Sequence, residues 1–133
     1  MANLHELLKT LVEAGGSDLH ITTNTSPMIR VDGKLKSLDV PPLSAIDTKQ
    51  LCYSVLTDTQ KQKFEEENEL DLSFGVKGLS RFRGNVFVQR GAVAGVFRVI
   101  PYKVLTFEEL GLPPVIKDLS EKHRGLILVT GPT

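Results

Sequence analysis

The sequence from Leu79 to Pro101, LSRFRGNVFVQRGAVAGVFRVIP, constrains the fold most, because it alternates over two long segments. Apolar residues at every second position form one face, as is typical of half-buried strands. This face contains Phe82, Val86, Val88, Val93, Phe97 and Val99, and only Gly84 and Gly95 interrupt it. Arg90-Gly91 is the only good turn dipeptide between the two segments, since glycine accepts a positive φ. We therefore predict an antiparallel hairpin that turns at Arg90-Gly91.

The predicted register places two arginines opposite each other on the second face of this hairpin. Arg83 lies across from Arg98, and Arg81 shares their face. Like charges directly opposite in an antiparallel pair cost roughly 0.2–1 kcal/mol. An anion is therefore expected here, since the guanidinium fork matches carboxylate and phosphate. Two interpretations stay open: the arginines pair with acids elsewhere in the fold, or they bind an external anion.

The residues before this hairpin predict several further strands and helices. We expect helices over 3–14 and after the capping residues Ser44 and Thr57, and strands over 17–22, 28–31, 34–38 and 69–76. Helices that alternate with mostly antiparallel strands are typical of an α+β fold.

The pattern changes after Pro101. Thr106 is expected to cap a short helical turn, and a helix is expected over 114–122, with proline in its first turn. The apolar run Leu126–Val129 does not alternate, so we predict a strand buried on both faces, as in a parallel sheet. Such a strand needs partner strands for its backbone groups. We therefore expect the chain to be a fragment of a longer protein.

Composition limits the classes of function. With 16 basic and 16 acidic residues the chain has no net basic field, so we expect no nucleic-acid partner. No apolar run reaches membrane-spanning length, and the one cysteine, Cys52, cannot form an internal disulfide; these features favour the cytoplasm. The histidines show no metal-ligand spacing, and we predict no metal site in the chain. Asp18 and His20 share a strand face, and we interpret them as a structural pair because no nucleophile motif accompanies them.

Six motifs in order resemble a known family over essentially the whole chain: GGSDLHI, RVDGKL, SRFRGNVFVQRG, FRVIP, FEELGLPP and GLILVTGPT. Together they resemble the PilT-type retraction ATPases of type IV pili, within the secretion-ATPase superfamily. The resemblance implies a PAS-like N-terminal domain over 1–101, a linker over 102–113 and the truncated start of a RecA-like ATPase domain over 114–133. It also implies a homo-hexamer that uses ATP and Mg²⁺, withdraws pilin subunits and works with a platform protein at the inner membrane.

The same resemblance implies which residues form the nucleotide site. Arg81, Arg83 and Arg98 stand in the motifs whose arginines reach the nucleotide phosphates in this superfamily, and Arg90 is a weaker candidate. Gly131, Pro132 and Thr133 would begin the phosphate-binding loop G-x-x-x-x-G-K-[ST], which is incomplete here. Because the lysine of that loop and the Mg²⁺-binding residues are missing, we expect no ATP hydrolysis by these 133 residues alone.

Two other functions remain as alternatives. The chain could be a non-enzymatic, PAS-like module whose arginines bind an anion or an acidic peptide. It could also belong to a related ATPase that assembles pili or drives type II secretion.

Overall fold

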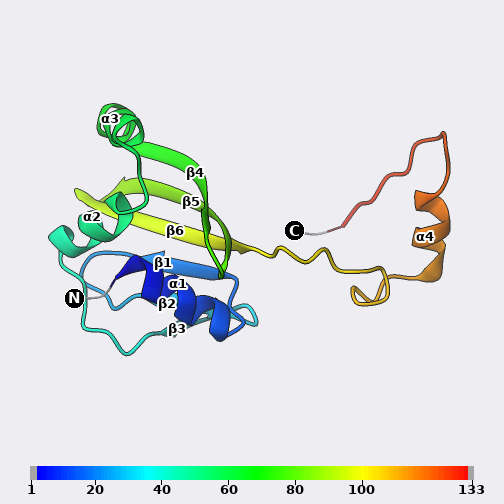
Figure 1. Cartoon of the computed structure of the whole chain (residues 1–133), viewed down its shortest axis with the longest axis horizontal. Helices are drawn as coiled ribbons and strands as arrows, with labels where there is room; N and C mark the ends of the chain where they lie inside the picture. Colours follow the sequence, from blue (N-terminus) through cyan, green and yellow to red (C-terminus); the bar gives the residue numbers. More distant parts are fainter. Residues whose placement is uncertain (1–2, 132–133) are drawn as a thin grey trace. The chain divides into compact units, whose positions relative to one another are not determined.

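The computed structural model describes residues 3–131 and divides into two compact units, Met1–Tyr102 and Lys103–Thr133. The first unit contains a six-stranded antiparallel sheet with the order β3-β2-β1-β6-β5-β4 (Figure 1). Its elements are α1 (Leu4–Glu13), β1 (Asp18–Ile21), β2 (Met28–Val31), β3 (Lys34–Ser37), α2 (Ala45–Tyr53), α3 (Asp58–Glu67), β4 (Glu69–Val76), β5 (Ser80–Gln89) and β6 (Ala92–Ile100). This arrangement confirms the predicted α+β class.

The central hairpin forms as predicted. β5 and β6 pair antiparallel, with Gln89 opposite Ala92 and Arg83 opposite Arg98. The turn residues Arg90 and Gly91 both have positive φ, +50° and +76°. A two-residue turn of this kind matches the twist of the strands that it joins.

One face of the sheet forms the hydrophobic core with the helices. Phe82, Val86 and Phe97 are fully buried, and Phe74 stacks on Phe82 with ring centroids 5.6 Å apart. Burial of a side chain of this size stabilises the fold by about 1.5–3 kcal/mol. The predicted inward face is therefore confirmed, except that Val88, near the end of β5, is 41% exposed.

The helices meet the sheet at defined strands: α1 contacts β1, α2 contacts β6 and α3 contacts β4. The predicted caps of the second and third helices are confirmed, since Ser44 with Asp47 and Thr57 with Gln60 both form capping boxes. These local hydrogen bonds fix where α2 and α3 begin.

Gly95 lets α2 approach β6 closely. A Cβ atom at this position would lie 2.9 Å from Cys52 Sγ and 3.1 Å from the Phe97 ring. Any larger residue would separate the helix from the sheet, so the glycine is required by packing rather than by its backbone conformation.

The unit Lys103–Thr133 has little regular structure in its described part. Thr106 and Glu109 exchange hydrogen bonds as predicted, and α4 (Pro114–Ser120) ends two residues before the expected boundary. The predicted strand at Leu126–Val129 is wrong for this chain, because these residues adopt no regular structure and are exposed. Strand pairing needs partner backbones, and no other described residue of this unit forms a strand. Within residues 3–131, no helix is long and apolar enough to cross a membrane.

Candidate functional site

The sheet face opposite the core carries the three arginines singled out in the sequence. Burial alternates along β5, where Arg81 and Arg83 are exposed between buried neighbours, and Arg98 is exposed on β6. We call this surface the arginine face and define it by Arg81, Arg83 and Arg98 with the acids Asp18 and Asp71. The predicted placement of the three arginines on one face is confirmed.

Strand register arranges four charged residues in one row across four strands. Arg30 of β2 lies opposite Asp18 of β1, Asp18 lies opposite Arg98 of β6, and Arg98 lies opposite Arg83 of β5. A carboxylate therefore separates Arg30 from the adjacent pair Arg98 and Arg83. The expected anion is thus supplied in part by the protein itself.

Asp18 and Arg98 form the best-defined contact of the row. Arg98 Nε donates a hydrogen bond of 2.8 Å to Asp18 Oδ1. The Asp18 side chain is only 5% exposed, whereas that of Arg98 is 69% exposed. Since the contact uses Nε, the two terminal nitrogens of Arg98 have no hydrogen-bond partner among residues 3–131.

The second oxygen of Asp18 is also occupied. Ser17 Oγ donates a hydrogen bond of 2.8 Å to Oδ2, and Arg30 Nε lies 3.7 Å from the same oxygen. Burial alone would raise the pKa of Asp18, but the hydrogen bonds from Arg98 and Ser17 and the charge of Arg98 outweigh it, so its pKa lies below the ordinary value. Asp18 is therefore a carboxylate at neutral pH.

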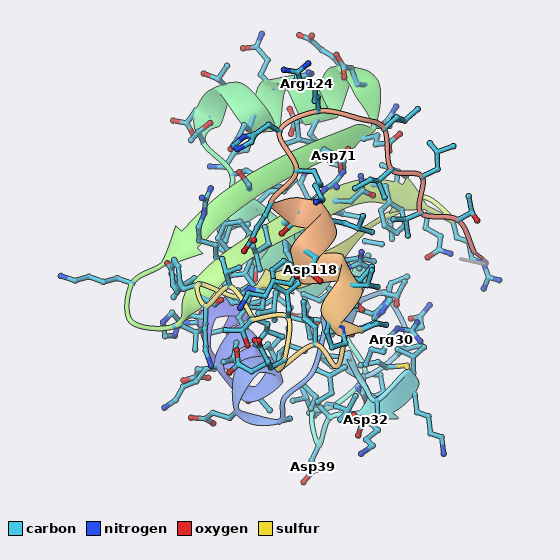
Figure 2. The ribbon with its side chains drawn as sticks, turned by 90° about the vertical axis from the view of Figure 1, so that its right-hand side faces the viewer. Arg30, Asp32, Asp39, Asp71, Asp118 and Arg124 are labelled. Atoms are coloured by element: carbon cyan, nitrogen blue, oxygen red, sulfur yellow. The ribbon has the colours of Figure 1, made fainter. Side chains whose placement is uncertain are left out.

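Arg83 has a much looser partner than Arg98. Its Nη2 lies 3.9 Å from Asp71 Oδ2, beyond hydrogen-bond distance, and both side chains are more than 60% exposed. Asp71 accepts a hydrogen bond of 3.0 Å from Asn85 Nδ2 instead. Figure 2 labels Arg30 of β2, at one end of the row, and Asp71 of β4, the edge strand that pairs with β5 at the other end.

Arg81 makes no hydrogen bond or ion pair with any residue that the structure describes. An open pocket of about 300 Å³ lies on the arginine face and is lined by Asp18, Asp71, Arg83, Asn85, Val96 and Arg98, but not by Arg81. Guanidinium groups with free terminal nitrogens around such a pocket can bind a phosphate or carboxylate group by paired hydrogen bonds. The acids of the arginine face therefore pair with its arginines only in part.

The pairing of Asp18 with His20 is not found. Asp18 bonds to Arg98 and Ser17, while Nε2 of His20 is buried without a hydrogen-bond partner among the described residues. Burial lowers the pKa of His20, the charge of Asp18 opposes this, and Arg30 adds to the lowering. His20 is therefore neutral at pH 7. Sequence reasoning missed the partnership of Asp18 with Arg98 because the two residues are 80 positions apart.

The remaining sequence candidates lie elsewhere. Arg90 sits in the β5–β6 turn and lines a different pocket with Thr22, Thr23, Asn24, Thr25 and Gln89. Gly131 is exposed and has no regular structure, and Pro132 and Thr133 lie outside the described residues. Among residues 3–131, no group of three or more His, Cys, Asp or Glu side chains is arranged to hold a metal ion.

Comparison with known proteins shows which family the chain is similar to. No family model matches the chain. It is 47% identical over 131 residues to the type IV pilus retraction ATPase PilT of Pseudomonas aeruginosa, an alignment that covers 98% of this chain and 38% of that protein. The chain belongs to the PilT-type family of pilus ATPases. A twitching motility protein of Neisseria gonorrhoeae is 40% identical over 108 residues, which cover 81% of this chain and 29% of that protein.

The fold agrees with this assignment. A crystal structure of the pilus retraction motor PilT with bound ADP superposes with a TM-score of 0.83 at 45% identity, covering 99% of this chain and 39% of that one. The Legionella pneumophila ATPase DotB, at 20% identity and a TM-score of 0.65 over 86% of this chain and 33% of that one, shares the fold alone. The chain thus spans well under half the length of the relatives that it matches.

Proposed function

We propose that this chain is the N-terminal part of a hexameric ATPase that retracts type IV pili. Residues 1–101 would form its PAS-like domain, 102–113 the linker and 114–133 the start of a RecA-like motor domain. The observation that carries the proposal is the 47% identity to PilT across 98% of the chain, and the pocket lined by Arg83 and Arg98 on the sheet supports it.

Arg81, Arg83 and Arg98 would contact the phosphates of ATP when the two domains close on the nucleotide. The residues present fit such a group, because the terminal nitrogens of Arg98 are free and Arg83 is held only loosely by Asp71. ATP, bound with Mg²⁺ in the whole protein, supplies the phosphoryl group. The arginines bind and neutralise charge on the phosphate oxygens, the main protein contribution to phosphoryl transfer.

Gly131, Pro132 and Thr133 would begin the phosphate-binding loop of the motor domain. Leu126–Val129 would become a strand there, paired with strands of that domain. Without the rest of the loop, these 133 residues bind no nucleotide tightly and do not hydrolyse it.

The whole protein would act in the cytoplasm, at the inner membrane, where its ring engages the platform protein of the pilus machinery. It has no nucleic-acid partner in this proposal, in keeping with the zero net charge of the chain.

Steady-state phosphate release by the full-length protein tests the role of the arginines. Arg83→Ala and Arg98→Ala are expected to lower turnover about a hundredfold, the scale of one lost electrostatic donor, while folding and ring assembly persist. Lys36→Ala is the matched control, because Lys36 is exposed and its register with Ile29 puts it on the opposite side of the sheet. Unchanged turnover in both arginine variants would contradict the proposal and favour a binding module.

A deletion strain tests the direction of force. Loss of the gene is expected to leave assembled pili on cells that no longer twitch. Cells without pili would instead indicate an assembly ATPase.

A further inference from the structure

We infer that Asp18 is a positioning residue that orients Arg98 toward a bound phosphate from inside the sheet. This inference rests on the proposed function of the arginine face. It concerns a residue that contacts no nucleotide itself and acts through the side chain of Arg98.

The geometry of the contact leaves the binding end of Arg98 free. Asp18 Oδ1 accepts from Nε of Arg98 at 2.8 Å, and no other described residue bonds to this guanidinium. The hydrogen bond at Nε restricts the Arg98 side chain, which is nevertheless 69% exposed, and both terminal nitrogens remain without a partner among the described residues. Less entropy is then lost when these nitrogens bind an oxyanion, which is the general advantage of preorganisation.

Asp18 is itself fixed at the centre of the sheet. Its other oxygen accepts from Ser17 Oγ at 2.8 Å. The backbone of Ser17 bonds to strands on both sides, since its N–H donates to Arg30 O at 2.8 Å and its carbonyl accepts from Val99 N at 3.0 Å. Ser17, whose hydroxyl holds this oxygen of the carboxylate, is therefore itself anchored by the backbone of β2 and β6.

Asp18 also balances the charge of the row. Arg98 and Arg83 lie directly opposite each other, and like charges in such a pair repel. The buried carboxylate offsets one of these charges, so the two guanidiniums can remain adjacent without a ligand. Loss of this charge should leave or strengthen anion attraction to the face while it releases Arg98 from its orientation.

The other acid of the face lacks these features. Asp71 is 62% exposed and stands 3.9 Å from Arg83 without a hydrogen bond. Asp18 alone therefore combines burial, a hydrogen bond to an arginine and a second fixed partner among the described residues of the arginine face.

A double-mutant cycle in the full-length protein tests the inference with Asp18→Asn, Arg98→Ala and the double variant. Asp18→Asn is expected to lower kcat tenfold to a hundredfold, with KM for ATP unchanged or lower, the scale expected from misplacing a group by about 1 Å. In the Arg98→Ala background, Asp18→Asn is expected to lower kcat no further. Asp39→Asn is the matched control, because Asp39 is exposed and outside the arginine face.

The outcomes separate this inference from the proposed function. If Arg98→Ala lowers kcat but Asp18→Asn does not, or if the two losses multiply in the double variant, the positioning role is overturned and the proposed function stands. If Arg98→Ala leaves kcat unchanged, the positioning role fails, and the proposed function fails with it only if Arg83→Ala also leaves turnover unchanged. Should Asp18→Asn not fold, the same cycle is measured with Asp18→Glu, which keeps the charge but moves the carboxylate by one methylene and is expected to lower kcat only while Arg98 is present.

Discussion

The two units of the chain differ in how far their residues find partners within it. The unit Met1–Tyr102 buries four leucines of α1 and the aromatic core of the sheet. In the described part of Lys103–Thr133, no residue is buried, and Val104, Leu126 and Val129 are each more than 80% exposed. Both units contain apolar segments, so hydrophobic composition alone does not explain the difference.

This difference shows which sequence patterns form structure locally and which need residues far away in the chain. Caps and turns form in both units, since Thr106 with Glu109 bonds as well as Ser44 with Asp47. These features need only neighbouring residues. Strands need distant backbones, and the apolar run Leu126–Val129 has no strand partner among the described residues of its unit. An apolar segment therefore forms the predicted strand only where partner strands are present.

The largest expected contrast comes from truncating an apolar side chain in each unit. In the 133-residue chain, Phe97→Ala should reduce the free energy of unfolding by about 3–5 kcal/mol, because Phe97 is fully buried. Leu128→Ala should change it by less than about 0.5 kcal/mol, because Leu128 is 77% exposed. Urea unfolding followed by circular dichroism measures both. Similar losses of unfolding free energy in the two variants would contradict the difference in burial between the two units.

Neutralising one acid in each unit gives the next contrast. Asp18→Asn should cost about 1.5–3 kcal/mol at pH 7, because a buried charged hydrogen bond is lost. Glu109→Gln, which alters an exposed cap, should change the unfolding free energy very little.

The pH dependence of Asp18→Asn sharpens this test. Because the pKa of Asp18 is lowered in the folded state, its stabilisation is present above the ordinary value of 3.8 and is lost as the pH falls through the folded value. The gap between wild type and Asp18→Asn should therefore narrow from pH 5 to pH 2. A constant gap would show that the charge of Asp18 contributes nothing.

Adding one methyl group to a glycine in each unit tests packing. Gly95→Ala should destabilise the fold by about 1–3 kcal/mol, since its Cβ would meet Cys52 Sγ at 2.9 Å. Gly131→Ala meets nothing within 4 Å and should be neutral. Adding Cys52→Ala to Gly95→Ala should restore part of the loss in melting temperature. No recovery would mean that contact with Phe97 dominates.

The smallest expected effect concerns histidine. Burial lowers the pKa of His20, so the unfolded chain binds its proton more tightly, and stability should fall as the pH drops below 6.5 toward the folded pKa. His20→Gln should remove this part of the decline in melting temperature. His123→Gln is the control, since His123 is exposed, and should leave the decline as in the wild type. An unchanged decline in His20→Gln would contradict the assignment.

The sequence was sufficient for features that arise within a hairpin or a helix end. The Arg83–Arg98 register followed from alternation and one turn dipeptide, and the capping residues followed from their spacing. The Asp18–Arg98 contact was missed because it requires β1 to pair with β6 across most of the chain. The role of Gly95 was also missed, because it depends on where α2 crosses β6. Alternation places a residue on a face, but only tertiary structure supplies its partner.

Amide hydrogen exchange at Leu126–Val129 tests most directly whether the two units differ because only one contains its partners. In the 133-residue chain at high dilution, these amides are expected to exchange rapidly, while those of β5 and β6 are protected. In the full-length protein both segments are expected to be protected, since the proposed motor domain supplies neighbouring strands. Protection of Leu126–Val129 in the dilute 133-residue chain, or rapid exchange in the full-length protein, would contradict the account.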